Sequence, residues 1–372
     1  MQTLFFTVNK KQKTLFENLK KKSQCEGKII YSKKLFLPSL SALRYLKQVD
    51  LSKPIALKTK DFKAKFGFES LEFFIKAIYT FLAYFNYFRY FNAITEEYDQ
   101  ILLWNGILFR QAIALEIAKL HNIQPIFAEI GLLPNRIVLD RNGVNYLNSV
   151  PREKSFFEAY HNDRPLPDTL IPRNPKNAKK FSNVKAIQLP QKYIFIPFQV
   201  DYDTQILEFS PWIKDMRMLF DVIENITKIT DINFVFKEHP SSIKNYTDLH
   251  QRASKNDQLY FANGHTTQEL IEKSDAVITV NSTVGIEALL FMKKVIVLGN
   301  AFYTIDGITK WAKSSNELSE ILRDLNGWKP DPCLIENFLK YLYYDYLLGS
   351  NFSTYHHDQK EKLTKLLEGI SL

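Results

Sequence analysis

Residues 275–300, DAVITVNSTVGIEALLFMKKVIVLGN, contain two short apolar runs separated by a segment of helix length. The two runs, DAVITVNS and KKVIVLGN, are rich in Val and Ile, which favour strands. A strand, a helix and a second strand in this order form a βαβ unit, whose two strands lie parallel in one sheet. This stretch therefore predicts a Rossmann-like α/β domain around it.

The same alternation extends over the rest of the chain. In the second half, YIFIPFQ (193–199), NFVFKEHP (233–240) and QLYFA (258–262) are separated by helix-length segments. The first half repeats the pattern less regularly, in TLFFTV (3–8), KIIYSKKLFLP (28–38), QILLWNG (100–106) and IQPIFAEIG (123–131). We therefore expect two Rossmann-like domains.

An irregular stretch rich in Pro, Asn and charge, VPREKSFFEAYHNDRPLPDTLIPRNPKNAKKFSNV, separates the two patterns and favours a linker. The expected organisation is a first Rossmann-like domain over 1–150, an irregular linker over 151–190, a second Rossmann-like domain over 191–330, and C-terminal helices over 331–372 that pack back on the first domain.

Composition narrows the class of protein. The chain has 372 residues, 45% hydrophobic and 24% charged, which is enough apolar material for two folded domains. Cys25 and Cys333 are far apart and outside any CxxC pattern, as in a protein of the reducing cytoplasm. The net charge of +9 favours a phosphate-bearing or anionic-lipid partner. The lysines are scattered without a nucleic-acid-binding motif, so no nucleic-acid partner is expected.

The longest apolar region, SLEFFIKAIYTFLAYFNYFRYFN (70–92), has the length of a membrane span. It contains Glu72, Lys76 and Arg89 and is rich in Phe and Tyr rather than Leu, Ile and Val, so a span is not expected. We favour a buried or half-buried helix; the alternative is an aromatic helix lying at a bilayer surface. The N-terminus shows no signal-peptide pattern.

Polar clusters follow three strands of the second half: FQVDYD, KEHP and NSTVGIEALL. In a parallel sheet these strand ends meet at the edge where ligands bind. Ser282 or Thr283 can cap a helix whose first turn contains Gly285, leaving N–H groups for a phosphate, with Glu287 one turn further for ribose hydroxyls. The alternative is a plain capped helix with an acidic first turn.

Lys237 and His239 lie two residues apart at a predicted strand end, so both side chains point to the same side of the sheet. A cation and an imidazole in this position suit the stabilisation of a leaving phosphate, although a lone histidine is more often structural. Asp201 and Asp203 form an Asp-x-Asp pattern that elsewhere binds a divalent metal. We expect no metal, because other positive groups are nearby.

Three stretches carry a family resemblance. KEHP (237–240) followed by SDAVITVNSTVGIEALLFMKKVIVLG (274–299), together with LLWNGILFRQAIALEIAKLHNIQPIFAEIGLLPNRIVLDRNGVNYLNSVPR (102–152), resembles the capsule polysaccharide biosynthesis family of KpsS/KpsC-type transferases. These transferases move 3-deoxy-D-manno-octulosonate (Kdo) from CMP-Kdo. The resemblance implies a GT-B-like α/β fold of two Rossmann-like domains facing a cleft, a retaining reaction that gives β-linked Kdo, and no metal or other cofactor. The single-module length is similar to that of the KpsS type.

The resemblance also implies roles for individual residues. Asp203 ends the family's Gln-x-x-x-Asp pattern and would be the catalytic carboxylate, and Glu129 would be the base toward the acceptor. The donor-binding residues would be Gln199, Lys237, His239, Asn281, Ser282, Thr283 and Glu287. Asn105 and Arg110 would lie on the acceptor side. This chain departs from the pattern at Asp201, Tyr202 and Ile130.

The expected function is transfer of Kdo from CMP-Kdo to lyso-phosphatidylglycerol or to a Kdo-bearing glycolipid, in the β-Kdo linker of a capsular polysaccharide. The expected location is the cytoplasm, peripheral on the inner face of the inner membrane, with its anionic surface and other capsule assembly proteins as partners. The alternatives are a GT-B transferase for CMP-sialic acid or a UDP-sugar, and a non-catalytic protein that binds anionic membrane or polysaccharide.

Overall fold

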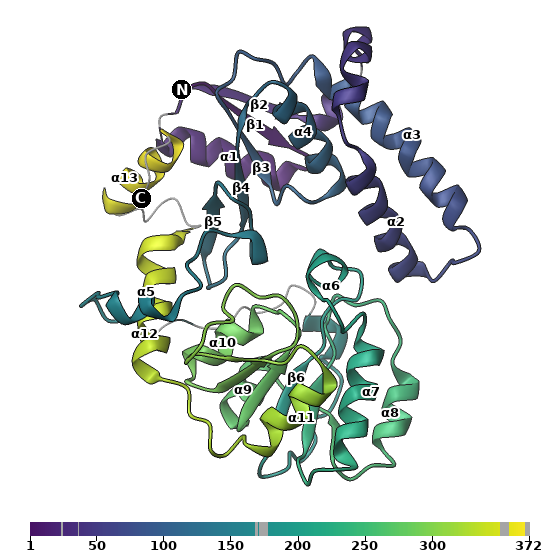
Figure 1. Cartoon of the computed structure of the whole chain (residues 1–372), viewed down its shortest axis with the longest axis vertical. Helices are drawn as coiled ribbons and strands as arrows, with labels where there is room; N and C mark the ends of the chain where they lie inside the picture. Colours follow the sequence, from purple (N-terminus) through teal and green to yellow (C-terminus); the bar gives the residue numbers. More distant parts are fainter. Residues whose placement is uncertain (24, 36, 168–169, 171–177, 350–356, 369–372) are drawn as a thin grey trace. The chain divides into compact units, whose positions relative to one another are not determined.

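The computed structural model describes residues 1–23, 25–35, 37–167, 170, 178–349 and 357–368 (Figure 1). The chain forms two units, one comprising Met1–Ser149 with Tyr346–Leu372 (unit 1) and the other Val150–Asp345 (unit 2). Each unit has its own six-stranded sheet with helices. The predicted α/β class with two Rossmann-like domains is confirmed. Residues 168–169 and 171–177 of the predicted linker, and 350–356 of the predicted C-terminal region, lie outside the described residues.

The sheet of unit 1 has the order β12-β5-β4-β3-β1-β2. Four strands are parallel: β1 (Thr3–Thr7), β2 (Gly27–Tyr31), β3 (Gln100–Trp104) and β4 (Gln124–Ile130). Helices α1 (Lys10–Ser23) and α4 (Phe109–Leu120) make the βαβ crossovers. Strands β5 (Arg136–Asp140) and β12 (Leu348–Gly349) extend the sheet in antiparallel pairs.

The end of the chain is part of unit 1. Helix α13 (His357–Leu367) contributes Leu363, Leu366 and Leu367 to the core that also contains residues of α1, β1, β3 and β4. The Tyr346 hydroxyl donates to Asp140, whose other carboxylate oxygen accepts from the backbone N–H of Asn142. Asp140 is therefore a buried residue that fixes a turn and anchors the returning chain.

The domain limits differ from those expected from the sequence. Helix α12 (Pro332–Lys340) packs in unit 2 on α5 (Lys154–Ala159), where the rings of Phe157 and Phe338 lie 5.4 Å apart. The Asn337 side chain donates to the Phe157 carbonyl at 2.9 Å. Only the chain from Tyr346 onward returns to unit 1. The limits of unit 2 depend on contacts between aromatic residues that are far apart in the sequence. Local composition cannot predict such contacts.

The sheet of unit 2 is parallel throughout and has the order β11-β10-β9-β6-β7-β8. Its strands are β6 (Ile194–Pro197), β7 (Phe234–Lys237), β8 (Leu259–Phe261), β9 (Ala276–Thr279), β10 (Lys294–Val297) and β11 (Lys310–Trp311). The chain builds outward from β6 to β8, then returns to the other side of β6 and builds outward from β9. This is the strand order of dinucleotide-binding sheets, and the order reverses between β6 and β9.

Helices complete both units (Figure 1). Unit 2 has α6 (Thr204–Phe209), α7 (Met216–Thr227), α8 (Thr247–Ala253), α9 (Thr267–Lys273), α10 (Val284–Leu290) and α11 (Ser315–Arg323). Its core gathers apolar side chains of β6, β7 and β9 with those of α7 and α11. Unit 1 also carries a helical hairpin of α2 (Ser52–Phe66) and α3 (Glu72–Phe91), whose turn begins at Gly67 in the left-handed region, at φ 75°.

Candidate functional site at the carboxyl edge of the second sheet

Two amide side chains bond to each other at the point in unit 2 where the strand order reverses, between β6 and β9. The Gln199 side chain, just after β6, donates from Nε2 to Asn281 Oδ1 at 2.9 Å, and its Oε1 accepts from the Asn281 backbone N–H at 3.1 Å. Asn281 Nδ2 donates to the carbonyls of Gln205 and Phe209. Both amides are buried. The pair therefore fixes the loop after β6 relative to the loop after β9, and acts by positioning these loops.

Asp203 caps α6 and is exposed. Its Oδ1 accepts from the backbone N–H of Gln205 at 2.9 Å, and more weakly from the Thr204 hydroxyl at 3.4 Å. This leaves Oδ2 accessible at the strand edge. Asp203 also lies close enough to His239 for its charge to act on the pKa of that imidazole. The structure thus brings together two residues that the sequence placed in one site.

Asp201 has a different role. Its side chain is 5% exposed and accepts from the Met216 backbone N–H at 2.8 Å and from the Tyr246 hydroxyl at 3.0 Å. Burial raises the pKa of Asp201, while these two hydrogen bonds lower it. The aspartate fixes the first turn of α7 and a buried tyrosine. This departure from the family pattern is therefore explained by packing.

His239 lies beyond the end of β7 and is partly buried. Its Nδ1 accepts from the Ser241 backbone N–H at 3.1 Å. Burial lowers the pKa of His239 below 6.5, although the Asp203 charge acts in the opposite direction. The ring is then neutral at pH 7 and carries its proton on Nε2, so it offers a neutral donor rather than a cation.

Lys237 does not point where the alternation of the strand suggests. Its ammonium donates to the carbonyls of Asn263 at 3.1 Å and His265 at 2.6 Å, and it lies 5.5 Å from the centre of the Phe181 ring. Burial lowers the pKa of Lys237. The strand ends at Lys237, so the two-residue period does not extend to His239. Lys237 closes the loop after β8, and contact with a phosphate requires those hydrogen bonds to break.

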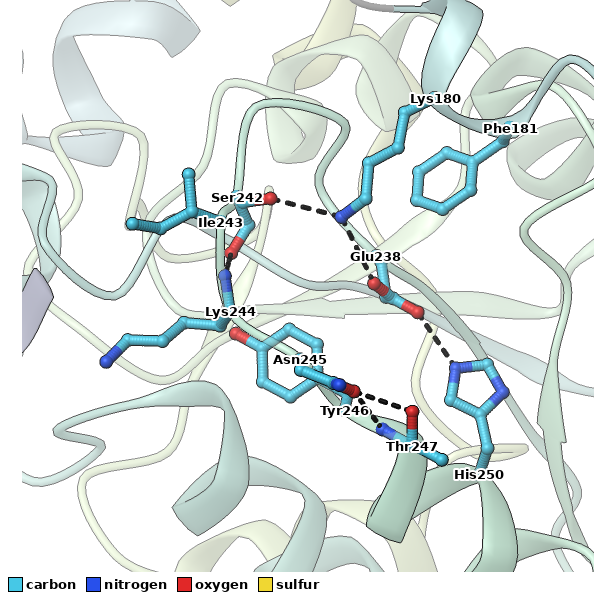
Figure 2. Close-up of a pocket in the computed structure, with 10 residues that line it drawn as sticks. All are labelled: Lys180, Phe181, Glu238, Ser242, Ile243, Lys244, Asn245, Tyr246, Thr247 and His250. Carbon is cyan, nitrogen blue, oxygen red and sulfur yellow. Dashed lines mark hydrogen bonds and ion pairs between the residues drawn. The ribbon is translucent and has the colours of Figure 1, made fainter. Parts of the chain in front are cut away.

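Glu238, between Lys237 and His239 in the sequence, lines a pocket of about 410 Å³ (Figure 2). Its carboxylate accepts from Asn263 Nδ2 at 2.8 Å, pairs with His250 at 2.8 Å and lies 3.4 Å from the Lys180 ammonium. Burial raises the pKa of Glu238, but these partners lower it below its usual value overall. Glu238 is therefore an ionised residue that organises the loops, not a free base. Sequence reasoning passed over it, although it lies inside the KEHP motif.

The start of α10 is shaped by close packing. Ser282 Oγ accepts from the Val284 backbone N–H at 3.2 Å, whereas the Thr283 side chain makes no capping bond. A Cβ at Gly285 would lie 2.7 Å from the Tyr303 hydroxyl, so glycine permits the helix to touch that ring. Ser282 and Thr283 are partly exposed at the edge, next to Asn281, while Glu287 is buried.

In unit 1, Asn105 and Glu129 meet at the ends of neighbouring strands β3 and β4, with Asn105 Nδ2 donating to Glu129 Oε2 at 2.9 Å. Asn105 and Gly106 both have left-handed backbones, at φ 64° and 78°, which explains the Asn-Gly turn. Arg110 is partly exposed in the first turn of α4. Burial raises the pKa of Tyr90, and the charge of Arg110 acts in the opposite direction. The three predicted acceptor-side and base residues thus belong to one strand-end region of this unit.

The structure brings together most of the predicted donor-side residues, namely Gln199, Asp203, His239, Asn281, Ser282 and Thr283. Lys237 and Glu287 lie inward of this edge. The described part of the chain contains no cluster of three or more His, Cys, Asp or Glu side chains placed to hold a metal ion. Two tyrosines that shape the edge, Tyr246 and Tyr303, were missed because isolated aromatic residues carry no spacing pattern.

Comparisons with known proteins agree with the family pattern. Residues 173–355 match the family model described as "Capsule polysaccharide biosynthesis protein". Protein FixF of Sinorhizobium fredii (strain NBRC 101917 / NGR234) is 35% identical over 265 residues, covering 69% of this chain and 62% of FixF. The capsule polysaccharide export protein KpsS of Escherichia coli is 29% identical over 306 residues, covering 66% of this chain and 77% of KpsS. The chain thus spans somewhat less than two thirds of FixF.

Among solved structures, the beta Kdo 2,7 transferase of Thermosulfurimonas dismutans KpsC aligns with 98% of this chain and 99% of its own, at 13% identity and a TM-score of 0.49. The family assignment rests instead on the sequence match and on the motifs, which lie at the strand ends described above. This chain belongs to the capsule polysaccharide biosynthesis family.

Proposed function

We propose that the chain is a retaining glycosyltransferase that moves Kdo from CMP-Kdo to a lipid or Kdo-terminated acceptor. The single observation that carries the proposal is the carboxyl edge of the second sheet. There the strand order reverses, the Gln199–Asn281 pair fixes the loop that presents Asp203, and His239 follows the neighbouring strand β7. An edge of this kind suits a nucleotide. Membership of the capsule polysaccharide family supports Kdo as the sugar.

In the proposed reaction Asp203 is the nucleophile. Its free carboxylate oxygen attacks the anomeric carbon of Kdo, and the bond from that carbon to the CMP phosphate oxygen breaks. An acceptor hydroxyl then displaces the carboxylate and gives its proton to a base. Two inversions retain the configuration of the donor. Glu129 is the candidate base, and Asn105 holds its carboxylate in place.

The leaving group of the proposed reaction needs little positive charge at the site. CMP leaves with one phosphate, so it needs less compensation than the diphosphate that metal-dependent transferases release. The neutral His239 donates from Nε2, and the partly exposed Ser282 and Thr283 add hydroxyl donors. A metal is not required for this step, and Asp201 is unsuited to bind one because its oxygens already accept two internal hydrogen bonds.

The acceptor and the setting of the reaction are part of the proposal. We place the reaction on the inner face of the inner membrane, with lyso-phosphatidylglycerol or a Kdo-bearing glycolipid as acceptor and other capsule assembly proteins nearby. The described residues include no helix long and apolar enough to cross a membrane. The net charge of +9 suits an anionic lipid surface.

The test is incubation with CMP-Kdo and either lyso-phosphatidylglycerol or a Kdo-terminated acceptor, with product detected by mass spectrometry and free CMP measured in parallel. The proposal predicts a Kdo-bearing product and release of CMP, with and without EDTA. If product forms from CMP-sialic acid or a UDP-sugar and not from CMP-Kdo, that nucleotide sugar is the donor instead. Absence of product and of CMP release with every donor would refute the transferase.

A further inference from the structure

Helix α3 is apolar on two opposite faces, and the described chain covers only one of them. Its inner face, which includes Ile75, Ala83 and Tyr87, is buried where α3 packs on α2 and α4. Its outer face is exposed: 63% for Phe74, 56% for Ile78, 68% for Phe81 and 42% for Phe85. The spacing of four, three and four residues places these side chains along one line of the helix.

Further large apolar side chains are exposed at the turn between α2 and α3. The rings of Phe66 and Phe68 stack 6.4 Å apart, and those of Phe81 and Phe85 stack 6.0 Å apart. We call this surface the aromatic face; its members are Phe66, Phe68, Leu71, Phe73, Phe74, Ile78, Phe81, Tyr84 and Phe85. Nine large exposed apolar side chains on one helical hairpin mark a surface that a partner or a membrane covers.

The hairpin that carries the aromatic face is basic. Residues 52–91 contain seven Lys or Arg and three Asp or Glu, a net charge of +4. The Arg89 guanidinium lies 5.2 Å from the centre of the exposed Phe85 ring. In Figure 1, α2 and α3 run side by side and their connecting turn lies away from the sheet of unit 1. Apolar rings and cations therefore occur together on one projecting element.

We propose that the aromatic face docks unit 1 onto an anionic lipid bilayer. Aromatic rings enter the boundary between headgroups and acyl chains, and lysines and arginines around them meet the anionic headgroups. Glu72, Lys76 and Arg89 keep the helix at the surface rather than across the bilayer. A protein partner fits less well, because the buried centres of protein interfaces are poor in lysine. This inference concerns unit 1 and does not rest on the proposed transferase activity.

The experiment is co-sedimentation of the full chain with vesicles, without any nucleotide sugar. One set contains phosphatidylcholine alone and the other equal parts of phosphatidylcholine and phosphatidylglycerol. We expect strong binding to the anionic vesicles only, weakened by salt. The double variant Phe74→Ser, Phe81→Ser should lose more than about tenfold in vesicle affinity, because two large apolar side chains no longer enter the bilayer. The matched control is Ile229→Ser, Met292→Ser, whose side chains are similarly exposed in unit 2.

A second variant, Lys53→Glu with Lys76→Glu, keeps every apolar side chain and should also lose binding to anionic vesicles. Circular dichroism verifies that each variant folds. Undiminished binding of both the serine and the glutamate variants would overturn the proposal. So would sedimentation velocity showing a dimer that the serine variant converts to monomer, with no vesicle binding by the wild type, because the face would then be covered by a second copy of the chain.

Discussion

Replacing Asp201 tests whether this residue is a structural acceptor rather than part of the chemistry. In Asp201→Ala, the Met216 backbone N–H and the Tyr246 hydroxyl lose their acceptor inside the core. In Asp201→Asn, the amide oxygen can still accept from Met216, and the amide nitrogen can donate to the Tyr246 oxygen. The two variants therefore separate loss of the hydrogen bonds from loss of the charge.

The expected magnitude follows from burial. Met216 is 0% and Tyr246 2% exposed, so water does not replace the lost acceptor. Each orphaned buried donor costs about 1–3 kcal/mol, so the loss of both hydrogen bonds in Asp201→Ala should lower the free energy of unfolding by about 2–6 kcal/mol. Asp201→Asn should stay within about 1 kcal/mol of wild type, because it keeps the pairing and removes a buried charge.

The pH dependence has a definite sign. Burial raises the pKa of Asp201 in the folded state above 3.8. The protonated carboxyl therefore contributes to stability fully below about pH 3.8, and this contribution is lost as the pH rises through the folded-state pKa. The asparagine variant does not titrate. The stability of Asp201→Asn relative to wild type should therefore improve as the pH rises above about 4.

The assay is urea denaturation of the wild type and both variants at several pH values, followed by far-UV circular dichroism. A cycle with Tyr246→Phe supplies the control, since removing the orphaned hydroxyl should cost less in the Asp201→Ala background than in wild type. Equal destabilisation by Ala and Asn, or additive effects in the cycle, would refute the structural role of Asp201.

Three further outcomes are expected. Gly285→Ala should lower the free energy of unfolding by about 1–3 kcal/mol, because its Cβ would lie 2.7 Å from the Tyr303 hydroxyl; an unchanged urea midpoint would contradict this packing. His239→Ala should weaken CMP binding in calorimetric titration, because the proposed complex uses its Nε2–H as a donor to the phosphate; unchanged affinity would contradict that proposed role. EDTA should leave the transfer rate unchanged, and loss of product restored by a divalent cation would revive the Asp-x-Asp metal site.

The sheet architecture could be predicted from sequence because each strand of unit 2 is a short apolar run followed by polar residues. The position of the strand ends then followed from topology, which explains why Gln199 and Asn281 were placed in one region. That these two amides bond to each other could not be predicted, since 82 positions separate them. The roles of Asp201 and Lys237 were hidden for the same reason, as their partners lie far away in the chain.

Helix α3 shows a different limit. Its sequence is apolar around most of the helix, so composition indicates burial but does not show which face the protein covers. Only the packing of α2 and α4 on one side reveals the exposed line of Phe74, Ile78, Phe81 and Phe85. The domain limits were hidden in a similar way, because the Phe157–Phe338 contact joins residues far apart in sequence.

The most direct test of the central claim is the rate of Kdo transfer from CMP-Kdo by Asp203→Asn compared with Asp201→Asn. Asparagine caps a helix about as well as aspartate, so Asp203→Asn keeps α6 intact and removes only the carboxylate. Asp203→Asn is expected to abolish transfer, while Asp201→Asn retains most of it. Equal loss in both variants, or full activity of Asp203→Asn, would contradict this expectation.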